Sequence, residues 1–441
     1  MKMKNKILIA IFVSVLLSGS SFALTLQESL DVALQQNPSI KSAKSNLEVS
    51  QTRLYQATGA FFPAIKLAGN YGRSYSDPST VQITATTSQG AVSQTYTFGF
   101  TTPYNSKSYS ASLSQPIFVG ALFPGYNMAA RSVNVSEQDL RKAIQDTTFN
   151  VTVTYYGVLA SKEYIKLCED SLQTAKTHHD QVARMLRNGV AAQADFLRAE
   201  VRVANAELAL TRSYNSYETT KNAFNNALGI DLDTTVEVSG KYEIPKLQVP
   251  NVELLLSTAY ANRPDWLSFV FGKEIAEQNL NLAKTAYLPT VYLSGNSAYQ
   301  DTTYPTFDNK VNSWSIAGSA SWTLFDGFTI YNKVREAAAS LNTQIANEEQ
   351  VKNSVEMEVK DAFYTLKTAM AVIATAQKAV VSAKESEKVS TMRYNSGVGT
   401  NLEVIDAQES LTQARNEYLK SIYDLEVAKA RINKNVGTKL L

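Results

Sequence analysis

Residues 108–120 read SYSASLSQPIFVG, and this stretch decides the fold. Hydroxylated side chains alternate in it with apolar ones, as they do in a β-strand with two different faces. The stretch ends at Gly120, and residues 128–187 then contain no proline. Such a span predicts a helix of about 90 Å at 1.5 Å per residue, far longer than an ordinary globular helix. The chain therefore contains a two-faced strand that leads into a very long helix.

This combination of strand and long helix occurs twice. Residues 313–327, SWSIAGSASWTLFDG, alternate in the same way and lead into the proline-free span 328–395. The two copies are offset by 327 − 120 = 207 at the glycine after the strand and by 397 − 189 = 208 at a later turn glycine. We infer an internal duplication of the whole chain.

The segments upstream of the strands also match. Each copy has a short helix that ends before a proline, and a second helix that ends before another proline. Both prolines are offset by 226 (264 − 38 and 289 − 63), so the first strand pair holds 226 − 207 = 19 extra residues. The extra residues lie between Arg73 and Ser106, for which we expect a long exposed loop with strand extensions, disorder being the alternative.

The predicted order in each copy is helix, helix, strand, strand, long helix, turn, long helix. The first repeat spans residues 24–239, with strands at about 64–75 and 105–119 and long helices at about 128–188 and 191–228. The second repeat spans residues 240–441, with strands at about 290–300 and 312–325 and long helices at about 328–395 and 400–435. In the last helix, apolar residues recur at the spacing of a coiled-coil seam: Leu411, Ala414, Tyr418, Leu425, Ala428 and Ile432.

The N-terminus predicts export. Three lysines precede an apolar run from Ile7 to Leu17, and Ser21-Phe22-Ala23 offers small residues for a signal peptidase. Residues 1–23 are therefore interpreted as a signal peptide cleaved after Ala23, with a retained membrane anchor as the alternative. Without the three lysines the charge is 39 − 40 = −1, which argues against nucleic acid as a partner.

The strands predict a membrane protein that must assemble. After Ala23 no apolar run approaches the ~20 residues of a membrane helix, so entry into a membrane would require a closed β-barrel. An apolar face opposite a hydroxylated one fits lipid outside and water inside, although a soluble sheet also alternates. Four strands are too few to close a membrane barrel, so several chains must share one. The sequence alone does not fix their number.

No catalytic, cofactor-binding or metal-binding residue is predicted. His178 and His179 are the only histidines. Adjacent helix positions do not share a face, so we expect two exposed polar side chains here and no metal site. The only cysteine, Cys168, is interpreted as a small buried apolar residue. Enzyme motifs are missing from the sequence. A coiled-coil surface protein is the other rival, although it does not explain the paired two-faced strands.

The chain resembles the TolC-like outer-membrane efflux family. Residues 115–120 and 322–327 look like that family's junctions between strand and long helix, and RYNSG (393–397) followed by EVIDAQ (403–408) resembles its second periplasmic turn. The resemblance covers essentially the whole mature chain. It implies a mainly α fold in which a homotrimer shares a twelve-stranded membrane β-barrel that continues into a periplasmic α-helical barrel. It also implies an outer-membrane location and lipid contact.

The resemblance further implies a function and partners. Family members are exit ducts of tripartite efflux pumps, and join an inner-membrane transporter of RND, MFS or ABC type through a periplasmic adaptor. The alternative within the family is the channel of a type I protein secretion system. The helical tips close the inner end of the duct like an iris. The transported substance and the transporter class do not follow from the sequence.

Three sets of positions carry over from the family. Glu403 and Asp406 match acidic positions at the constricted entrance, and Asp195 matches Glu403 in the first repeat because 195 + 208 = 403. Tyr394 matches a latch tyrosine, whereas Gly399 stands where the family prototype has a latch arginine that Arg393 or Arg198 could replace. The adaptor-docking tips are Gly189, Val190, Ala191, Ala192, Gly397, Val398, Gly399 and Thr400. Solvated charges and a packed tyrosine are the alternative reading of the acidic and tyrosine positions.

Overall fold

The computed structural model describes residues 23–75, 77, 79–87, 90–98, 102–240, 250–304 and 307–440. Residues 1–22, which make up all but the last residue of the predicted signal peptide, lie outside the described residues. The chain divides into two compact units. A helical unit holds residues up to 48, 134–270 and 346–441, and a sheet unit holds residues 49–133 and 271–345.

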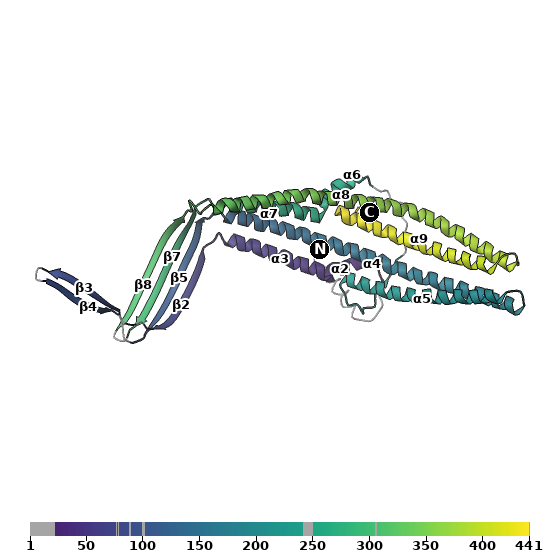
Figure 1. Ribbon diagram of the computed structural model, residues 1–441, viewed down its shortest axis with the longest axis horizontal. Coiled ribbons are helices and arrows are strands. Elements are labelled where there is room, and N and C mark those ends of the chain that lie inside the picture. Colours follow the sequence, from purple (N-terminus) through teal and green to yellow (C-terminus); the bar gives the residue numbers. More distant parts are fainter. Residues whose placement is uncertain are drawn as a thin grey trace, which may run out of the picture. The chain divides into compact units, whose positions relative to one another are not determined.

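The sheet unit is built on four antiparallel strands (Figure 1). In spatial order they are β2 (Ala64–Ser74), β5 (Tyr104–Phe118), β7 (Thr290–Thr303) and β8 (Asp308–Ser321). The first two strands come from the first repeat and the last two from the second, and β5 pairs with β7 to join them. Strands β2 and β8 therefore each have one unpaired edge within the described sheet.

The register collects the apolar side chains on one face of this sheet. Ile65 pairs with Leu113, Leu113 with Gly295, and Gly295 with Ile316. The neighbouring row on the opposite face contains Lys66, Ser112, Asn296 and Ser315. The apolar side chains are strongly exposed, with Ile65 at 72% and Ile316 at 72%. The alternation inferred from the sequence is thus present, and its apolar face is uncovered in the single chain.

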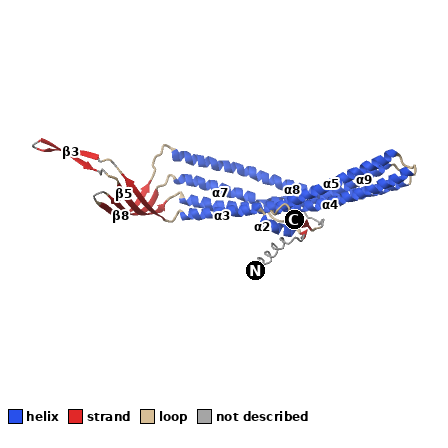
Figure 2. Ribbon diagram, turned by 90° about the horizontal axis from the view of Figure 1, so that it is seen from below, coloured by secondary structure: helices blue, strands red, loops and turns tan. Residues whose placement is uncertain are grey.

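Three details of the sheet unit differ from the sequence expectation. The segment expected to be a loop forms a separate hairpin of β3 (Ser79–Thr87) and β4 (Gly90–Phe98) (Figure 2). Strand β8 stops at Ser321, before the predicted end near residue 325. Trp322 continues the alternation in sequence, but its indole Nε1 donates to the Tyr287 carbonyl at 3.0 Å at the end of the strand. Helix α4 begins at Leu122 rather than near 128. Pro124 is tolerated there because it lies in the first turn, where a backbone N–H would have no partner within the helix.

The helical unit contains both pairs of long helices. In the first repeat, α4 (Leu122–Arg187) is followed by α5 (Gln193–Leu228), and in the second, α8 (Thr329–Asn395) is followed by α9 (Asn401–Val436). Helices α4 and α8 also continue into the sheet unit. The shorter helices are α2 (Leu26–Gln36), α3 (Pro38–Gly59), α6 (Val252–Asn262) and α7 (Pro264–Thr285), and β1 (Ala23–Leu24) pairs in parallel with β6 (Glu237–Val238). None of the described helices is both long and apolar enough to cross a membrane.

Two apolar cores in the helical unit repeat the duplication residue by residue. One core holds Val151 of α4 and Phe224 and Leu228 of α5, all almost fully buried. The other holds their counterparts 208 residues later in α8 and α9, namely Val359, Ile432 and Val436. The predicted seam of α9 contributes Leu425, Ala428 and Ile432 to this second core. Equivalent positions are buried in both repeats, so the order expected for the fold is confirmed.

Each core is closed by a glycine packed against a helix junction. Gly229 and Gly437 end α5 and α9 in the left-handed conformation, with φ of 76° and 84°. A Cβ on Gly229 would lie 2.6 Å from the Asn37 Cα at the α2–α3 junction. A Cβ on Gly437 would lie 2.7 Å from the Arg263 nitrogen at the α6–α7 junction. Only glycine allows both the backbone conformation and the close approach.

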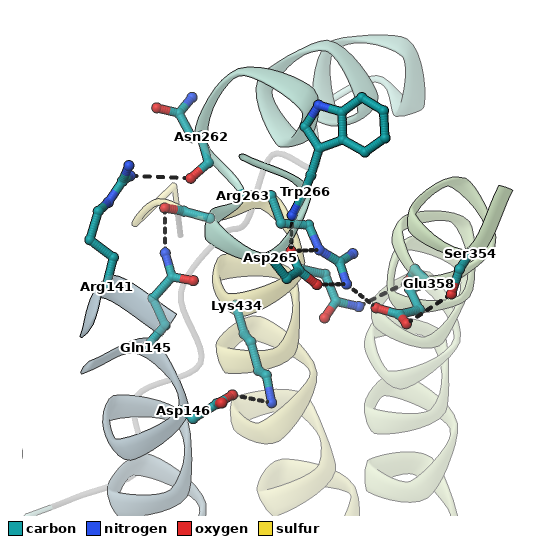
Figure 3. Close-up of polar contacts among 12 residues, drawn as sticks. Arg141, Gln145, Asp146, Asn262, Arg263, Asp265, Trp266, Ser354, Glu358 and Lys434 are labelled. Carbon is teal, nitrogen blue, oxygen red and sulfur yellow. Dashed lines mark hydrogen bonds and ion pairs between the residues drawn. The ribbon is translucent and has the colours of Figure 1, made fainter. Parts of the chain in front are cut away.

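The second junction carries an ion pair on a buried arginine (Figure 3). The side chain of Arg263 is 9% exposed, contacts Glu358 of α8, and binds Asp265 with both Nε and Nη2, at 2.8 and 2.9 Å. Burial by itself would raise the pKa of Asp265, but the hydrogen bonds and charge of Arg263 outweigh it, and the net shift is downward. Across the same junction, Gln145 of α4 donates to the Gly437 carbonyl at 2.6 Å. These contacts hold the α6–α7 junction against α8 and the C-terminal end of α9 against α4.

Candidate functional site at the helical turns

The turns that join the long helices have the same backbone design. Gly189 and Gly397 both adopt φ of 74°, as expected for a residue just beyond a helix C-terminus. The next amide in each turn reaches back to the helix: Val190 to the Met185 carbonyl at 2.9 Å, and Val398 to that of Arg393 at 3.0 Å. The glycines predicted from the sequence are therefore helix-ending residues.

The residues of both turns form open surface. Val190 and Val398 are 71% and 69% exposed, and a Cβ on Gly189 or Gly397 would meet nothing within 4 Å. Leu197 and Leu402 in the first turns of the return helices are also half exposed. Exposed apolar residues around a helical turn are typical of a surface that a partner covers. The sequence analysis did not single out the two leucines, because their exposure depends on the neighbouring hairpin.

The acidic positions lie at the beginnings of the return helices. Glu403 and Asp406 are exposed on α9, three residues apart, and the side chain of Asp195 on α5 is 28% exposed. Glu403 lies 3.8 Å from an Arg393 nitrogen, and Asp195 lies 3.8 Å from an Arg198 nitrogen. Asp406 has no ion pair among the residues that the structure describes. The three carboxylates thus lie on the same end of the helical unit, with loose arginine contacts to two of them.

The position of Gly399 admits no side chain in this turn. A Cβ there would lie 2.9 Å from the Tyr394 nitrogen and 3.0 Å from the Arg393 Cβ. The two arginines considered as replacements each bind within their own hairpin. Arg393 of α8 contacts Glu403 of α9, and Arg198 contacts Asp195 on the same helix. Within the part of the chain that the structure describes, neither arginine makes an ion pair between the α4/α5 hairpin and the α8/α9 hairpin.

Tyr394 is buried between the two hairpins. It is 7% exposed and packs with Val182 of α4, Ala199 of α5 and Val404 of α9. Its hydroxyl oxygen is buried without a hydrogen-bond partner in the described part of the chain. Burial raises the pKa of this phenol, and the nearby Asp195 carboxylate raises it further. The structure thus brings Tyr394 and Asp195 close together without a hydrogen bond between their side chains.

The exposed position expected for His178 is wrong. His178 is 4% exposed, and its Nε2 lies 2.7 Å from Oδ1 of Asn401, the first residue of α9. The Asn401 Nδ2 donates to the Asp195 carbonyl at 3.1 Å. Burial lowers the pKa of His178, an effect that the Asn401 hydrogen bond partly offsets. The periodicity of one helix could not reveal this contact, because its partner lies 223 residues away.

Other reactive groups form no site among the described residues. No group of three or more His, Cys, Asp or Glu side chains there could hold a metal ion. His179 does not join His178 and packs against Phe196, with 5.0 Å between ring centroids. Cys168 is a buried free thiol, as expected, and burial raises its pKa.

Comparisons with known proteins agree on one family. The sequence profile of the outer membrane efflux protein family matches residues 29–230 and 255–438, one stretch in each repeat. The alkaline protease secretion protein AprF of Pseudomonas aeruginosa is 22% identical over 427 residues, covering 96% of this chain and 86% of that protein. The outer membrane protein TolC of Escherichia coli is 21% identical over 460 residues, covering 98% and 87%.

The fold is also shared with solved structures. The Campylobacter jejuni CmeC outer membrane channel superposes with a TM-score of 0.80 at 18% identity, covering 93% of this chain and 85% of that one. The Vibrio cholerae outer membrane protein VceC superposes with a TM-score of 0.78 at 19% identity, covering 94% and 96%. At these identities the likeness establishes the fold.

Proposed function

This chain belongs to the outer membrane efflux protein family, and we propose that it is the exit duct of a tripartite efflux pump. It is an outer-membrane channel protein with a large helical part in the periplasm. In the proposed pump it receives substrates from an inner-membrane transporter of RND, MFS or ABC type through a periplasmic adaptor. One observation carries the proposal: the chain combines an open-edged sheet, apolar on one face, with two long helical hairpins that end in exposed turns.

The free sheet edges support assembly into a homotrimer. In one chain, β2 and β8 each leave an edge unpaired, and the apolar face between them is exposed. Unpaired backbone groups are costly in lipid, so the β8 edge of one copy must pair with the β2 edge of the next. Three copies give a closed barrel of twelve strands. Its apolar face contacts outer-membrane lipid, and the hydroxylated face lines the water-filled interior.

The exposed turns support adaptor docking. The two turns share one backbone conformation, with Val190 and Val398 both pointing into open space. A trimer would display six nearly equivalent turns, which suits a helical-hairpin adaptor that binds each of them in a similar way. The proposed docking residues remain 189–192 and 397–400.

The acidic residues at the turns support a cation-selective gate. In a trimer, Glu403 and Asp406 would each form a ring of three like charges, and such rings favour cations in a constriction. Asp195 would add a third set of charges from the first repeat. Because Arg393 and Arg198 partly compensate two of these positions, Asp406 should contribute most to selectivity.

The gate assignment is tested by neutralising the ring. Purified trimers of the Glu403→Gln, Asp406→Asn double variant are compared with wild type in planar bilayers under a salt gradient. We expect a reversal potential closer to zero, because the constriction has lost its fixed negative charge. A Glu163→Gln, Glu356→Gln variant serves as control, since these carboxylates have a similar exposure, 46% and 40%, but lie far from the turns in α4 and α8. Equal selectivity in all three proteins would remove Glu403 and Asp406 from the gate.

A type I protein secretion channel is the second candidate function. Its support is the similarity to AprF, whose name describes protease secretion. The two functions share the trimer, the adaptor and the gate, and differ in the transporter and in what passes. Deleting the gene and measuring both drug accumulation in cells and the proteins in the culture medium separates them. Drug accumulation with an unchanged secreted proteome supports efflux, and the converse supports secretion.

A further inference from the structure

A buried polar contact joins the two helical hairpins next to their turns. His178 belongs to α4 and Asn401 to α9, and both are almost fully buried, at 4% and 2% exposed. Because the Asn401 Nδ2 donates to the Asp195 carbonyl, its Oδ1 is the acceptor, and His178 must donate from Nε2. Two successive hydrogen bonds, from His178 to Asn401 and from Asn401 to the Asp195 carbonyl, therefore link α4, α9 and α5.

The contact is present at only one of two equivalent places. The duplication offset of 208 maps His178 onto Ser386 and maps Asn401 back onto Gln193. Both of these counterparts are exposed in the chain. Between neighbouring copies, α8 would face α5 as α4 faces α9 within one chain, and the equivalent pair there is a serine and a glutamine in place of the histidine and the asparagine. The His178–Asn401 contact is therefore specific to the junction between hairpins of the same chain.

Within the described residues, Gly399, the neighbouring arginines and Tyr394 make no hydrogen bond or ion pair across the junction. Gly399 leaves no space for a side chain, and the neighbouring arginines bind inside their own hairpins. Tyr394 packs edge-on against His178, with 5.5 Å between ring centroids, but its hydroxyl has no hydrogen-bond partner in the described part of the chain. Another polar link joins Gln181 of α4 to Asn395 of α8 near the solvent, where Gln181 is half-buried and Asn395 is exposed.

We propose that the hydrogen bond between His178 and Asn401 is the latch that holds the α8/α9 turn against the α4/α5 turn in the closed channel. The proposal rests on the function proposed above. Opening separates the two hairpins and must break this bond. The groups around His178 are His179 on its own helix, Asp195 on α5, Tyr394 on α8 and Asn401 on α9. In the closed state a neutral His178 satisfies the buried Asn401 oxygen without placing a charge in the apolar cluster around Val182 and Val404.

The test compares channel opening in variants of each partner. His178→Leu leaves the buried Asn401 Oδ1 without its donor. Asn401→Ala leaves the His178 Nε2 without its acceptor and also removes the donor to the Asp195 carbonyl, and these losses are costly in the closed state only. For each variant we expect the equilibrium between open and closed to shift about fivefold or more per chain. Because the three bonds break together, the ratio of open to closed time of the trimer in planar bilayers should rise about a hundredfold or more. His178→Gln, which keeps an N–H donor, should stay close to wild type. His179→Leu is the matched control, because its ring packs against Phe196 outside the hydrogen bond.

A double variant separates latch loss from general damage. In His178→Leu, Asn401→Leu both partners of the hydrogen bond are removed, so neither is left buried without the other. The increase in its opening should be smaller than the product of the two single effects. If the two substitutions acted through unrelated structural damage, their effects on opening would multiply. If His178→Leu does not assemble, Asn401→Ala and His178→Gln still decide the matter from the other partner.

The results distinguish the latch from the proposed function. Wild-type protein that forms no ion-conducting trimer refutes the exit duct itself. Conducting wild type together with single variants that open no more than His179→Leu refutes the latch alone. Increased opening in both single variants, with His178→Gln unchanged, establishes it.

Discussion

Four glycines end the four long helices in the same backbone conformation but in different surroundings. Gly189, Gly229, Gly397 and Gly437 have φ of 74°, 76°, 74° and 84°. A Cβ would meet nothing within 4 Å at the two turn glycines, and would meet backbone atoms at 2.6 to 2.9 Å at the two junction glycines. Replacing each in turn by alanine therefore separates the cost of the conformation from the cost of the close approach.

The expected magnitudes follow from these distances. Alanine in the left-handed conformation costs about 1–2 kcal/mol, and this is the whole effect expected for Gly189→Ala and Gly397→Ala. Gly229→Ala adds an overlap with the Asn37 backbone, which is held by the hydrogen bond from its side chain to the Ala227 carbonyl at 2.9 Å. Overpacking of this kind costs about 1–3 kcal/mol more. The total for Gly229→Ala, and likewise for Gly437→Ala, is about 2–5 kcal/mol.

The assay is thermal unfolding of each detergent-solubilised variant, followed by circular dichroism at 222 nm at one heating rate. A fixed rate is needed because large assemblies often unfold irreversibly. Both junction variants should melt well below both turn variants. Asparagine tolerates the left-handed conformation, so Gly189→Asn should melt near wild type while Gly229→Asn stays low. Equal losses in the turn and junction variants would mean that backbone conformation alone sets the cost, and that the packed junctions contribute nothing.

Three further outcomes are expected. Acidification should open the wild-type channel. Burial lowers the pKa of His178 in the closed state, so neutral His178 stabilises that state above about pH 6.5 and this stability is lost at lower pH. Bilayer recordings from about pH 8 to about pH 5 should show a flatter dependence of opening on pH for His178→Gln. Arg263→Met should lower the melting temperature at pH 7, with a deficit that shrinks as pH falls below about 4, because the pKa of Asp265 is lowered in the native state and its protonation removes the ion pair. Cys168 should resist alkylation in the native protein at pH 8 and react after unfolding, since burial raises the pKa of its thiol, and mass spectrometry would detect an early reaction that contradicts this.

The fold could be inferred from the sequence because its main features are local. Proline-free spans, two-faced alternation and paired offsets of 207, 208 and 226 are all visible along the chain. The sequence predictions are wrong where the contacts of a residue differ from what its local sequence pattern indicates. Trp322 continues the alternation of a strand, yet its indole bonds to the Tyr287 carbonyl beyond the strand end. The β3–β4 hairpin was foreseen only as strand extensions of a loop, because the segment around it is rich in polar residues.

The candidate site could be inferred only in part. The turn glycines follow from helix-ending chemistry, and the acidic and tyrosine positions came from family resemblance, so their roles stay predictions. The exposed position predicted for His178 was wrong because a helix pattern reports which side a residue faces, and not what a distant segment places there. Asn401 is a polar residue at a helix start, where exposure is the ordinary expectation, yet it is 2% exposed. Contacts of this kind are determined by the packing of one repeat against the other.

That packing has a consequence for how the proposed duct would open. In a trimer of a duplicated chain, contacts between hairpins of one chain alternate with contacts between neighbouring chains. The two kinds of contact begin from similar sequences, but only the contact within a chain has the buried His178–Asn401 bond, because Ser386 and Gln193 stand at the other. Three buried bonds, one in each chain, therefore oppose separation of the hairpins. A threefold-symmetric opening breaks all three bonds in the same movement. The factor by which a latch variant raises the ratio of open to closed state in one chain is therefore raised to the third power in the assembled channel.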